Sequence, residues 1–128
     1  MIVDTSAIIA ILANEVERPD LIARMARADT CRISAGSLIE ISAVITRRHV
    51  ATDADLQALL NSTRTLIEPM TVEQAWVGYA AYREFGIGSR HPARLNFGDC
   101  FAYALSKATG EPLLFKGDDF ARTDVVAA

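Results

Sequence analysis

Short apolar stretches alternate with longer helical stretches along this 128-residue chain, and the alternation limits the available folds more than any other feature. The apolar stretches lie at 2–3, 31–34, 66–67 and 113–115, with a weaker one at 125–126. Between them, helices are expected at about 7–13, 21–28, 35–49, 52–64, 71–86 and 96–110. Strands that alternate with helices form a parallel or mostly parallel sheet covered by helices. We therefore expect an α/β fold with a central sheet of about four or five strands.

Helix-capping residues support several of these boundaries. Thr5-Ser6 is predicted to cap the first helix. Thr71–Gln74 is a capping box, in which a hydroxyl and an amide three positions later satisfy each other's backbone groups. Asn96 is predicted to cap the last helix, which carries Phe97 and Phe101 on its apolar face.

The length and composition suit an ordinary globular protein. We expect residues 1–128 to form one domain, and a hydrophobic content of 51% is typical of a packed core. No run of about 18 apolar residues occurs, so no membrane span is predicted. The first residues lack the basic and apolar segments of an export signal. Cys31 and Cys100 have no metal-binding or redox spacing, so a cytoplasmic location is expected.

Acidic residues directly follow two of the predicted strands. Asp4 comes after Ile2-Val3, and the pair Asp118–Asp119 follows the stretch 113–115. In open parallel sheets, ligands bind at the carboxyl ends of the strands, near the point where the strand order reverses. A carboxylate after a buried strand is costly to desolvate unless it is paired. Asp4 is therefore a candidate functional residue, although a plain role at the start of the first helix stays open.

The other acidic candidates also have ordinary interpretations. Glu40 would be a solvated residue of a helix, Asp99 would favour a helix dipole, and Asp118–Asp119 would form a turn. Together with Asp4 they have a coherent use, because gathered carboxylates repel each other until a cation relieves the repulsion. An all-oxygen site without histidine or cysteine suits Mg²⁺ or Mn²⁺. Such a metal activates water for the hydrolysis of phosphate esters.

Four stretches, taken in order, carry a family resemblance. They are Met-Ile-Val-Asp-Thr-Ser-Ala-Ile at the start, Ser37-Leu-Ile-Glu40, Leu95-Asn-Phe-Gly-Asp-Cys-Phe-Ala-Tyr103, and Pro112-Leu-Leu-Phe-Lys-Gly-Asp-Asp-Phe120 followed by Thr123-Asp124. The set resembles PIN-domain ribonucleases, and most closely the VapC-type toxins of bacterial toxin–antitoxin pairs. The resemblance covers essentially the whole chain. It implies a three-layer α/β/α domain with a central parallel sheet.

The resemblance also implies roles for individual residues. Asp4, Glu40 and Asp99 match the three family acids that bind the metal, Mg²⁺ with Mn²⁺ as a substitute, or position the attacking water. Ser6 matches the hydroxyl that steadies the first acid. Asn96 matches a polar residue beside the site.

The fourth acid of the family is displaced in this chain. Many relatives place it where this chain has Gly117, so Asp118 and Asp119 are the available substitutes. Both are retained as catalytic candidates. The displacement is the best argument for a second hypothesis, a catalytically weak PIN-fold binding module. A third hypothesis, an aspartate-based phosphatase with Asp4 as nucleophile, lacks the second acid two residues on, where this chain has Ser6.

The resemblance further implies a substrate and partners. Family members cut RNA, leave a 3′-hydroxyl and a 5′-phosphate, and usually act as homodimers. A small VapB-like antitoxin wraps the toxin and often places an arginine in the acidic pocket, where charge-assisted hydrogen bonds replace the metal. The sequence does not indicate which RNA is cut, at what sequence, or with how many metal ions.

Basic and aromatic residues give weaker indications. The formal net charge of −3 argues against nucleic-acid binding; setting aside four of the 16 acids for a metal site leaves 12 against 13 basic residues. Arg83, Arg90 and Arg94 lie in or near the long loop 86–95 and, with Lys116, are candidates for contacts with RNA phosphates. An ordinary solvated loop is the alternative. The helical spacing of Trp76, Tyr79 and Tyr82 predicts a core or dimer face rather than a base-stacking surface.

Overall fold

Four strands form one parallel sheet in the computed structural model, which describes residues 1–128. The strands are β1 (Ile2–Val3), β2 (Arg32–Ser34), β3 (Leu66–Glu68) and β4 (Leu113–Leu114), in the order β3-β2-β1-β4. Every neighbouring pair is parallel, which confirms the predicted α/β fold. The weak strand predicted at 125–126 is wrong, since only an isolated bridge between Leu113 and Ala127 occurs there.

Pairs of helices connect successive strands. The helices are α1 (Thr5–Leu12), α2 (Arg18–Arg27), α3 (Ala35–Arg48), α4 (Asp53–Ser62), α5 (Val72–Phe85) and α6 (Asp99–Thr109), and a 3-10 turn at Phe120–Arg122 follows β4. Each predicted helix is present. The second begins earlier than predicted, because Pro19 occupies its first turn. None of the helices combines the length and the apolar character that a membrane span requires.

The cap of α1 differs from the prediction. Asp4, rather than Thr5 or Ser6, is the N-cap residue: its backbone is extended, and its Oδ2 accepts a hydrogen bond of 2.8 Å from the N–H of Ser6. The capping box Thr71–Gln74 at the start of α5 is confirmed. The shifted cap matters because it makes the residue that ends β1 also the residue that begins α1.

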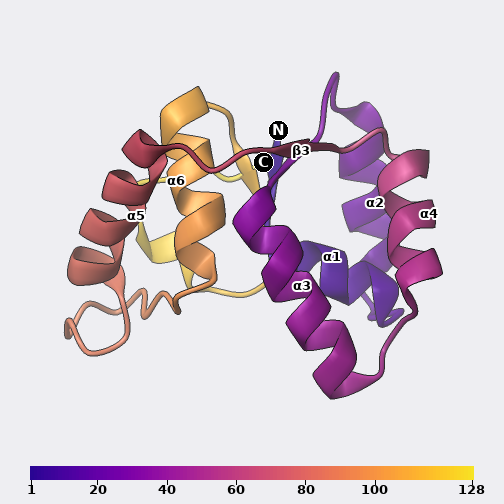
Figure 1. Cartoon of the computed structure of the whole chain (residues 1–128), viewed down its shortest axis with the longest axis horizontal. Coiled ribbons are helices and arrows are strands. Elements are labelled where there is room, and N and C mark those ends of the chain that lie inside the picture. Colours follow the sequence, from indigo (N-terminus) through magenta and orange to yellow (C-terminus); the bar gives the residue numbers. More distant parts are fainter.

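The pleat of the strands divides the core into two parts. Ile2 and Leu113 point into a cluster with residues of α5 and α6, whereas Val3 and Leu114 point into a cluster with residues of α1, α2, α3 and α4. Successive side chains of a strand face opposite sides of the sheet. Figure 1 shows the outcome, with α5 and α6 on one side of the molecule and α1, α2 and α4 on the other.

The strand order reverses at the carboxyl ends of β1 and β4. The connections after β1 and β2 lead outward to one edge of the sheet, whereas the connection after β3 returns past β1 to the opposite edge. Ile2 pairs with Leu113 and Val3 with Leu114, and the N–H of Asp4 donates to the carbonyl of Leu114 at 2.8 Å. Ligand sites form at such a switch point, and Asp4 lies in it.

Helices α3 and α6 approach each other closely. A Cβ added at Gly36 would lie 2.6 Å from the ring of Phe101, so only glycine at this position of α3 leaves room for the aromatic ring of α6. The close approach brings the middle of α3 next to the N-terminus of α6.

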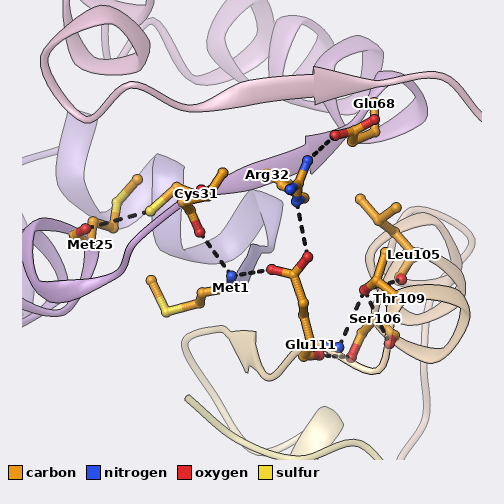
Figure 2. Close-up of polar contacts among 10 residues, drawn as sticks. Met1, Met25, Cys31, Arg32, Glu68, Leu105, Ser106, Thr109 and Glu111 are labelled. Carbon is orange, nitrogen blue, oxygen red and sulfur yellow. Dashed lines mark hydrogen bonds and ion pairs between the residues drawn. The ribbon is translucent and has the colours of Figure 1, made fainter.

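The charge of Arg32, at the start of β2, is paired with two acidic residues. Figure 2 shows Arg32 of β2 between Glu68 of β3 and Glu111, which precedes β4. Its Nε lies 2.9 Å from Glu111 Oε1, and a second guanidinium nitrogen bonds Glu68. These ion pairs link the first residue of β2 to the last residue of β3 and to the segment before β4.

Candidate active site

Asp4 is a buried carboxylate with one unpaired oxygen. Its exposed fraction is 1%, and Oδ2 accepts the hydrogen bond from the N–H of Ser6. Oδ1 is buried without a hydrogen-bond partner. Burial, and secondarily the charge of Glu40, raise the pKa of Asp4 to about 6, although hydrogen bonding from Ser6 acts in the opposite direction. The unpaired oxygen is the strongest indication that Asp4 does more than cap α1.

Glu40 is held between the end of β1 and the start of α6. The hydroxyl of Thr5 donates to Glu40 Oε2 at 2.6 Å. A Cβ added at Gly98 would lie only 1.7 Å from Glu40 Oε1, so the carboxylate rests directly against the backbone of Gly98. Glu40 is therefore held against Thr5 and Gly98 and is not an ordinary solvated helix residue. Sequence reasoning missed Thr5 and Gly98, whose only indication was that each adjoins a candidate acid.

Asp99 is oriented by a reciprocal cap at the start of α6. The N–H of Asn96 donates to Asp99 Oδ2 at 2.6 Å, and Asn96 Oδ1 accepts from the N–H groups of Gly98 and Asp99 at 2.6 and 3.1 Å. Asp99 is 8% exposed. Burial raises its pKa to about 7, aided by the charges of Asp4, Glu40 and Asp119 and opposed by the Asn96 N–H. Asn96 thus has the predicted place beside the site.

Both candidates for the fourth acid, Asp118 and Asp119, are exposed in the turn after β4. The charge of Asp119 contributes to the raised pKa of Asp99, so we carry Asp119 forward as the candidate. The turn is tied to α1, because the N–H of Lys116 donates to Ser6 Oγ at 2.9 Å. Ser6 therefore bonds Asp4 through its backbone N–H, while its hydroxyl holds the turn that carries Asp119.

The converging residues fit a hard divalent cation. Asp4, Glu40, Asp99 and Asp119 come from four separate segments and supply only carboxylate oxygens. No three His, Cys, Asp or Glu side chains are arranged to coordinate one ion by themselves. Mg²⁺ does not require such a cage, because it usually keeps several waters and binds through one or two carboxylates. The unpaired Oδ1 of Asp4 and the mutual repulsion of the acids are what a cation would relieve.

Only some of the predicted cationic residues are free. The ammonium of Lys116 pairs with Glu15 and Glu17, at 3.1 Å from Glu17, and it would have to leave these partners to contact an RNA phosphate. Arg83, Arg90 and Arg94 are exposed and form no ion pair. They remain candidates for phosphate contacts along the loop 86–95.

The aromatic residues of α5 are not part of the core. Trp76, Tyr79 and Tyr82 are all exposed, Trp76 by 66%. The rings of Trp76 and Tyr79 pack edge to face at 5.6 Å, and the guanidinium of Arg83 lies 5.8 Å from the centre of the Tyr79 ring. Of the two predicted roles, a core or a dimer face, the first is excluded.

Comparison with known proteins connects this site to a family. The family model of the PIN domain matches residues 1–126. The chain is 46% identical over 129 residues to Ribonuclease VapC28 of Mycobacterium tuberculosis, covering 100% of this chain and 97% of the relative. It is 45% identical over 126 residues to Ribonuclease VapC42 of the same organism, covering 98% and 96%.

Solved structures share the fold. The crystal structure of VapC20 of Mycobacterium tuberculosis, described as a toxin that cleaves the sarcin-ricin loop, superposes with a TM-score of 0.73 at 20% identity and covers 99% of this chain and 97% of that chain. A toxin–antitoxin complex from Klebsiella pneumoniae superposes with a TM-score of 0.70 at 17% identity, covering 99% and 95%.

The metal-free protein is expected to lose stability as the pH rises from about 4 to about 7. Asp4 and Asp99 have pKa values of about 6 and about 7 when folded, above those of the unfolded chain. Their contribution is present below the unfolded pKa of 3.8 and is lost as the pH rises through the folded values. The expected loss is roughly 1–3 kcal/mol, measured by thermal or urea unfolding with a chelator present.

Asp99→Asn should flatten this pH dependence, because it removes one of the repelling charges. Asp118→Asn is the matched control and should leave it unchanged. A free energy of unfolding that rises over the same pH range, or an identical profile for Asp99→Asn, would contradict the electrostatics described here.

Proposed function

This chain belongs to the PIN domain family, and from that premise we propose that it is a ribonuclease of the VapC type, the toxin of a toxin–antitoxin pair. The observation that carries the proposal is the convergence of Asp4, Glu40, Asp99 and Asp119 at the carboxyl edge of the sheet. Relatives that are named ribonucleases align over nearly the full length of both chains. The acids therefore lie in a chain that resembles these relatives over its whole length, and not in an isolated motif.

We further propose that the site works with Mg²⁺, for which Mn²⁺ can substitute. Asp4, through its free Oδ1, and Asp99 would hold the ion, with Glu40 beside them. When bound, such an ion lowers the pKa of water and stabilises charge on a phosphate that undergoes in-line displacement. The donor set supports this choice, because carboxylates and water are the ligands that Mg²⁺ prefers.

The remaining contacts of the site serve to orient these acids. Thr5 donates to Glu40 Oε2, and the Gly98 backbone lies against Oε1, so the carboxylate is held from both sides. Asn96 fixes Asp99 through the cap of α6. Ser6 links the Asp4 carboxylate to the turn of Asp119. Groups held in this way need no rearrangement when charge develops on the substrate.

The partners follow from the same chemistry. We propose that RNA reaches the site past Arg90 and Arg94, whose charges are free to contact phosphates, whereas Arg83 lies over the Tyr79 ring of α5. We also propose a small antitoxin that inserts an arginine among the acids, because a guanidinium satisfies carboxylates through charge-assisted hydrogen bonds. The likeness to a chain from a toxin–antitoxin complex supports this partner. The acids Asp4, Glu40 and Asp99, with Asp119 proposed as the fourth, favour an active enzyme over an inactive binding module.

Purified protein, freed of any antitoxin, should cleave RNA only when Mg²⁺ or Mn²⁺ is present. Asp99→Asn should reduce the rate by about 100-fold or more, since it removes a group that stabilises the transition state. Asp119→Asn should reduce it far more than the matched control Asp118→Asn. Cleavage that persists with a chelator, or that is unchanged in Asp99→Asn, would indicate a contaminating nuclease and reject the proposal.

Gly98→Ala should abolish most of the activity while the protein stays folded. The added methyl group would overlap Glu40 Oε1 and force the carboxylate out of place, and a displacement of about 1 Å can reduce a rate by about 100-fold. The backbone of Gly98 has φ −66°, which alanine adopts without strain. Cleavage assays and thermal unfolding measure the two effects, and full activity of a folded Gly98→Ala protein would show that the position of Glu40 is unimportant.

We propose that the chain forms a homodimer through the exposed face of α5. Val72, Trp76, Tyr79 and Arg83 are exposed and lie on one side of this helix. Tryptophan, tyrosine and arginine are the residue types enriched at the centres of protein interfaces. The fold itself makes no use of this surface, because the buried residues of α5 point toward α6 and the sheet.

Trp76→Ala should convert the dimer to a monomer at micromolar concentration. Removal of a central interface tryptophan typically costs about 2 kcal/mol or more of association free energy. Sedimentation analysis measures the change, with Glu84→Ala, on another side of α5, as the control. A dimer that survives Trp76→Ala, or a wild-type protein that is monomeric throughout, would disprove this interface.

A further inference from the structure

An apolar groove of about 620 Å³ lies directly beside the acidic site. Its walls come from α3 and from the turn that begins α6, and include Ile39, Val44, Arg47, Phe97 and Phe101. Glu40, Asn96 and Gly98, which position the acids, also line it. Any molecule in this groove therefore lies against the catalytic centre.

Phe97 is exposed where the sequence predicted a packed residue. Its side chain is 72% exposed, and its only aromatic neighbour is Phe101, which packs edge to face at 5.1 Å with an angle of 79°. Phe101 is itself seated against Gly36. The Phe97 ring is thus supported from one side while most of it faces solvent, and the fold gains little apolar burial from it.

The chain fixes the position of this ring relative to the acids. Phe97 lies between Asn96, whose side chain and N–H bond the start of α6, and Gly98, which touches Glu40. The turn that holds Asp99 and Glu40 in place therefore also holds the ring. A flexible surface phenylalanine would lack this constraint.

The groove also carries a free positive charge. Arg47 of α3 lines it and forms no ion pair, in contrast to the neighbouring Arg48, which pairs with Glu15. An occupant that suits the groove has a flat apolar group for Phe97 and Ile39 and a negative charge for Arg47. An unpaired nucleotide offers both, because nucleobases stack on aromatic rings and phosphates bind arginine.

We propose that the groove binds an unpaired nucleotide of the RNA substrate, with its base stacked on Phe97 and a backbone phosphate at Arg47. This inference rests on the proposed ribonuclease function. It adds a binding position for the nucleotide next to the cleaved bond. It also makes the substrate single-stranded at that point, since a paired base cannot stack on a protein ring. A protein segment is the competing occupant and is separated from RNA by the choice of variants.

Binding of fluorescein-labelled single-stranded RNAs of about 12 nucleotides to the Asp99→Asn protein measures the contact without cleavage. Adding Phe97→Ala should weaken binding by about tenfold or more. Phe97→Trp should retain affinity, because it keeps a ring face, whereas Phe97→Leu should bind as weakly as Phe97→Ala. Val126→Ala, which removes an exposed apolar group outside the groove, is the control. If the Phe97→Leu protein binds RNA as tightly as the protein that keeps Phe97, base stacking on this residue is excluded.

Arg47→Gln tests the phosphate contact separately. It should reduce the dependence of log K on log salt by about 0.7, whereas Arg64→Gln, which removes an unpaired arginine after α4, should not. Ultraviolet cross-linking of 5-iodouridine RNA should label Phe97 in the mass spectrum of the digested protein.

The outcomes separate this proposal from the function on which it rests. If the wild-type protein shows metal-dependent cleavage but Phe97→Ala cleaves and binds RNA normally, the groove assignment fails and the ribonuclease stands. If Phe97→Leu and Phe97→Ala bind RNA normally but one of them loses the antitoxin, the groove belongs to a protein segment. If the wild-type protein neither binds nor cleaves RNA, both proposals fail.

Discussion

A carboxylate that is buried but only half paired governs the arrangement of this molecule. Asp4 ends a strand in the middle of the sheet, caps α1 with one oxygen and leaves the other without a partner. A protein normally compensates a buried charge with a cation or with further hydrogen bonds. Here the neighbouring charges are those of Glu40 and Asp99, and Lys116 is directed to Glu15 and Glu17 instead. The resulting concentration of negative charge suits a metal ion, an arginine of a partner, or protons at low pH.

The position of Glu40 shows how packing serves this electrostatic site. Gly36 admits the Phe101 ring, which sets the distance between α3 and α6, and Gly98 then accepts the Glu40 carboxylate against its backbone. Elsewhere in the sheet the charges are compensated, because Arg32 of β2 joins Glu68 of β3 and Glu111 before β4 (Figure 2). Ion pairs therefore join segments of the sheet in one place, and uncompensated acids gather in another.

The sequence was sufficient for the sheet and for the edge at which the site forms, because parallel strands place their carboxyl ends together whatever their distance along the chain. The sequence was insufficient where tertiary packing determines the direction or the partner of a side chain. The direction of Glu40 depends on which side of α3 meets α6, and the choice between Asp118 and Asp119 depends on a turn held by Ser6. The pairing of Lys116 with Glu15 joins residues 101 positions apart, and the exposure of Phe97 contradicts its place in an apolar pattern.

Anomalous diffraction from crystals soaked in Mn²⁺ tests the metal site most directly. A single strong peak is expected at the carboxyl ends of β1 and β4, at about 2.1 Å from a carboxylate oxygen of Asp4 and of Asp99, and it should vanish in Asp99→Asn crystals. Crystals of a protein that cleaves RNA but binds Mn²⁺ elsewhere, or not at all, would show that the four acids have another purpose.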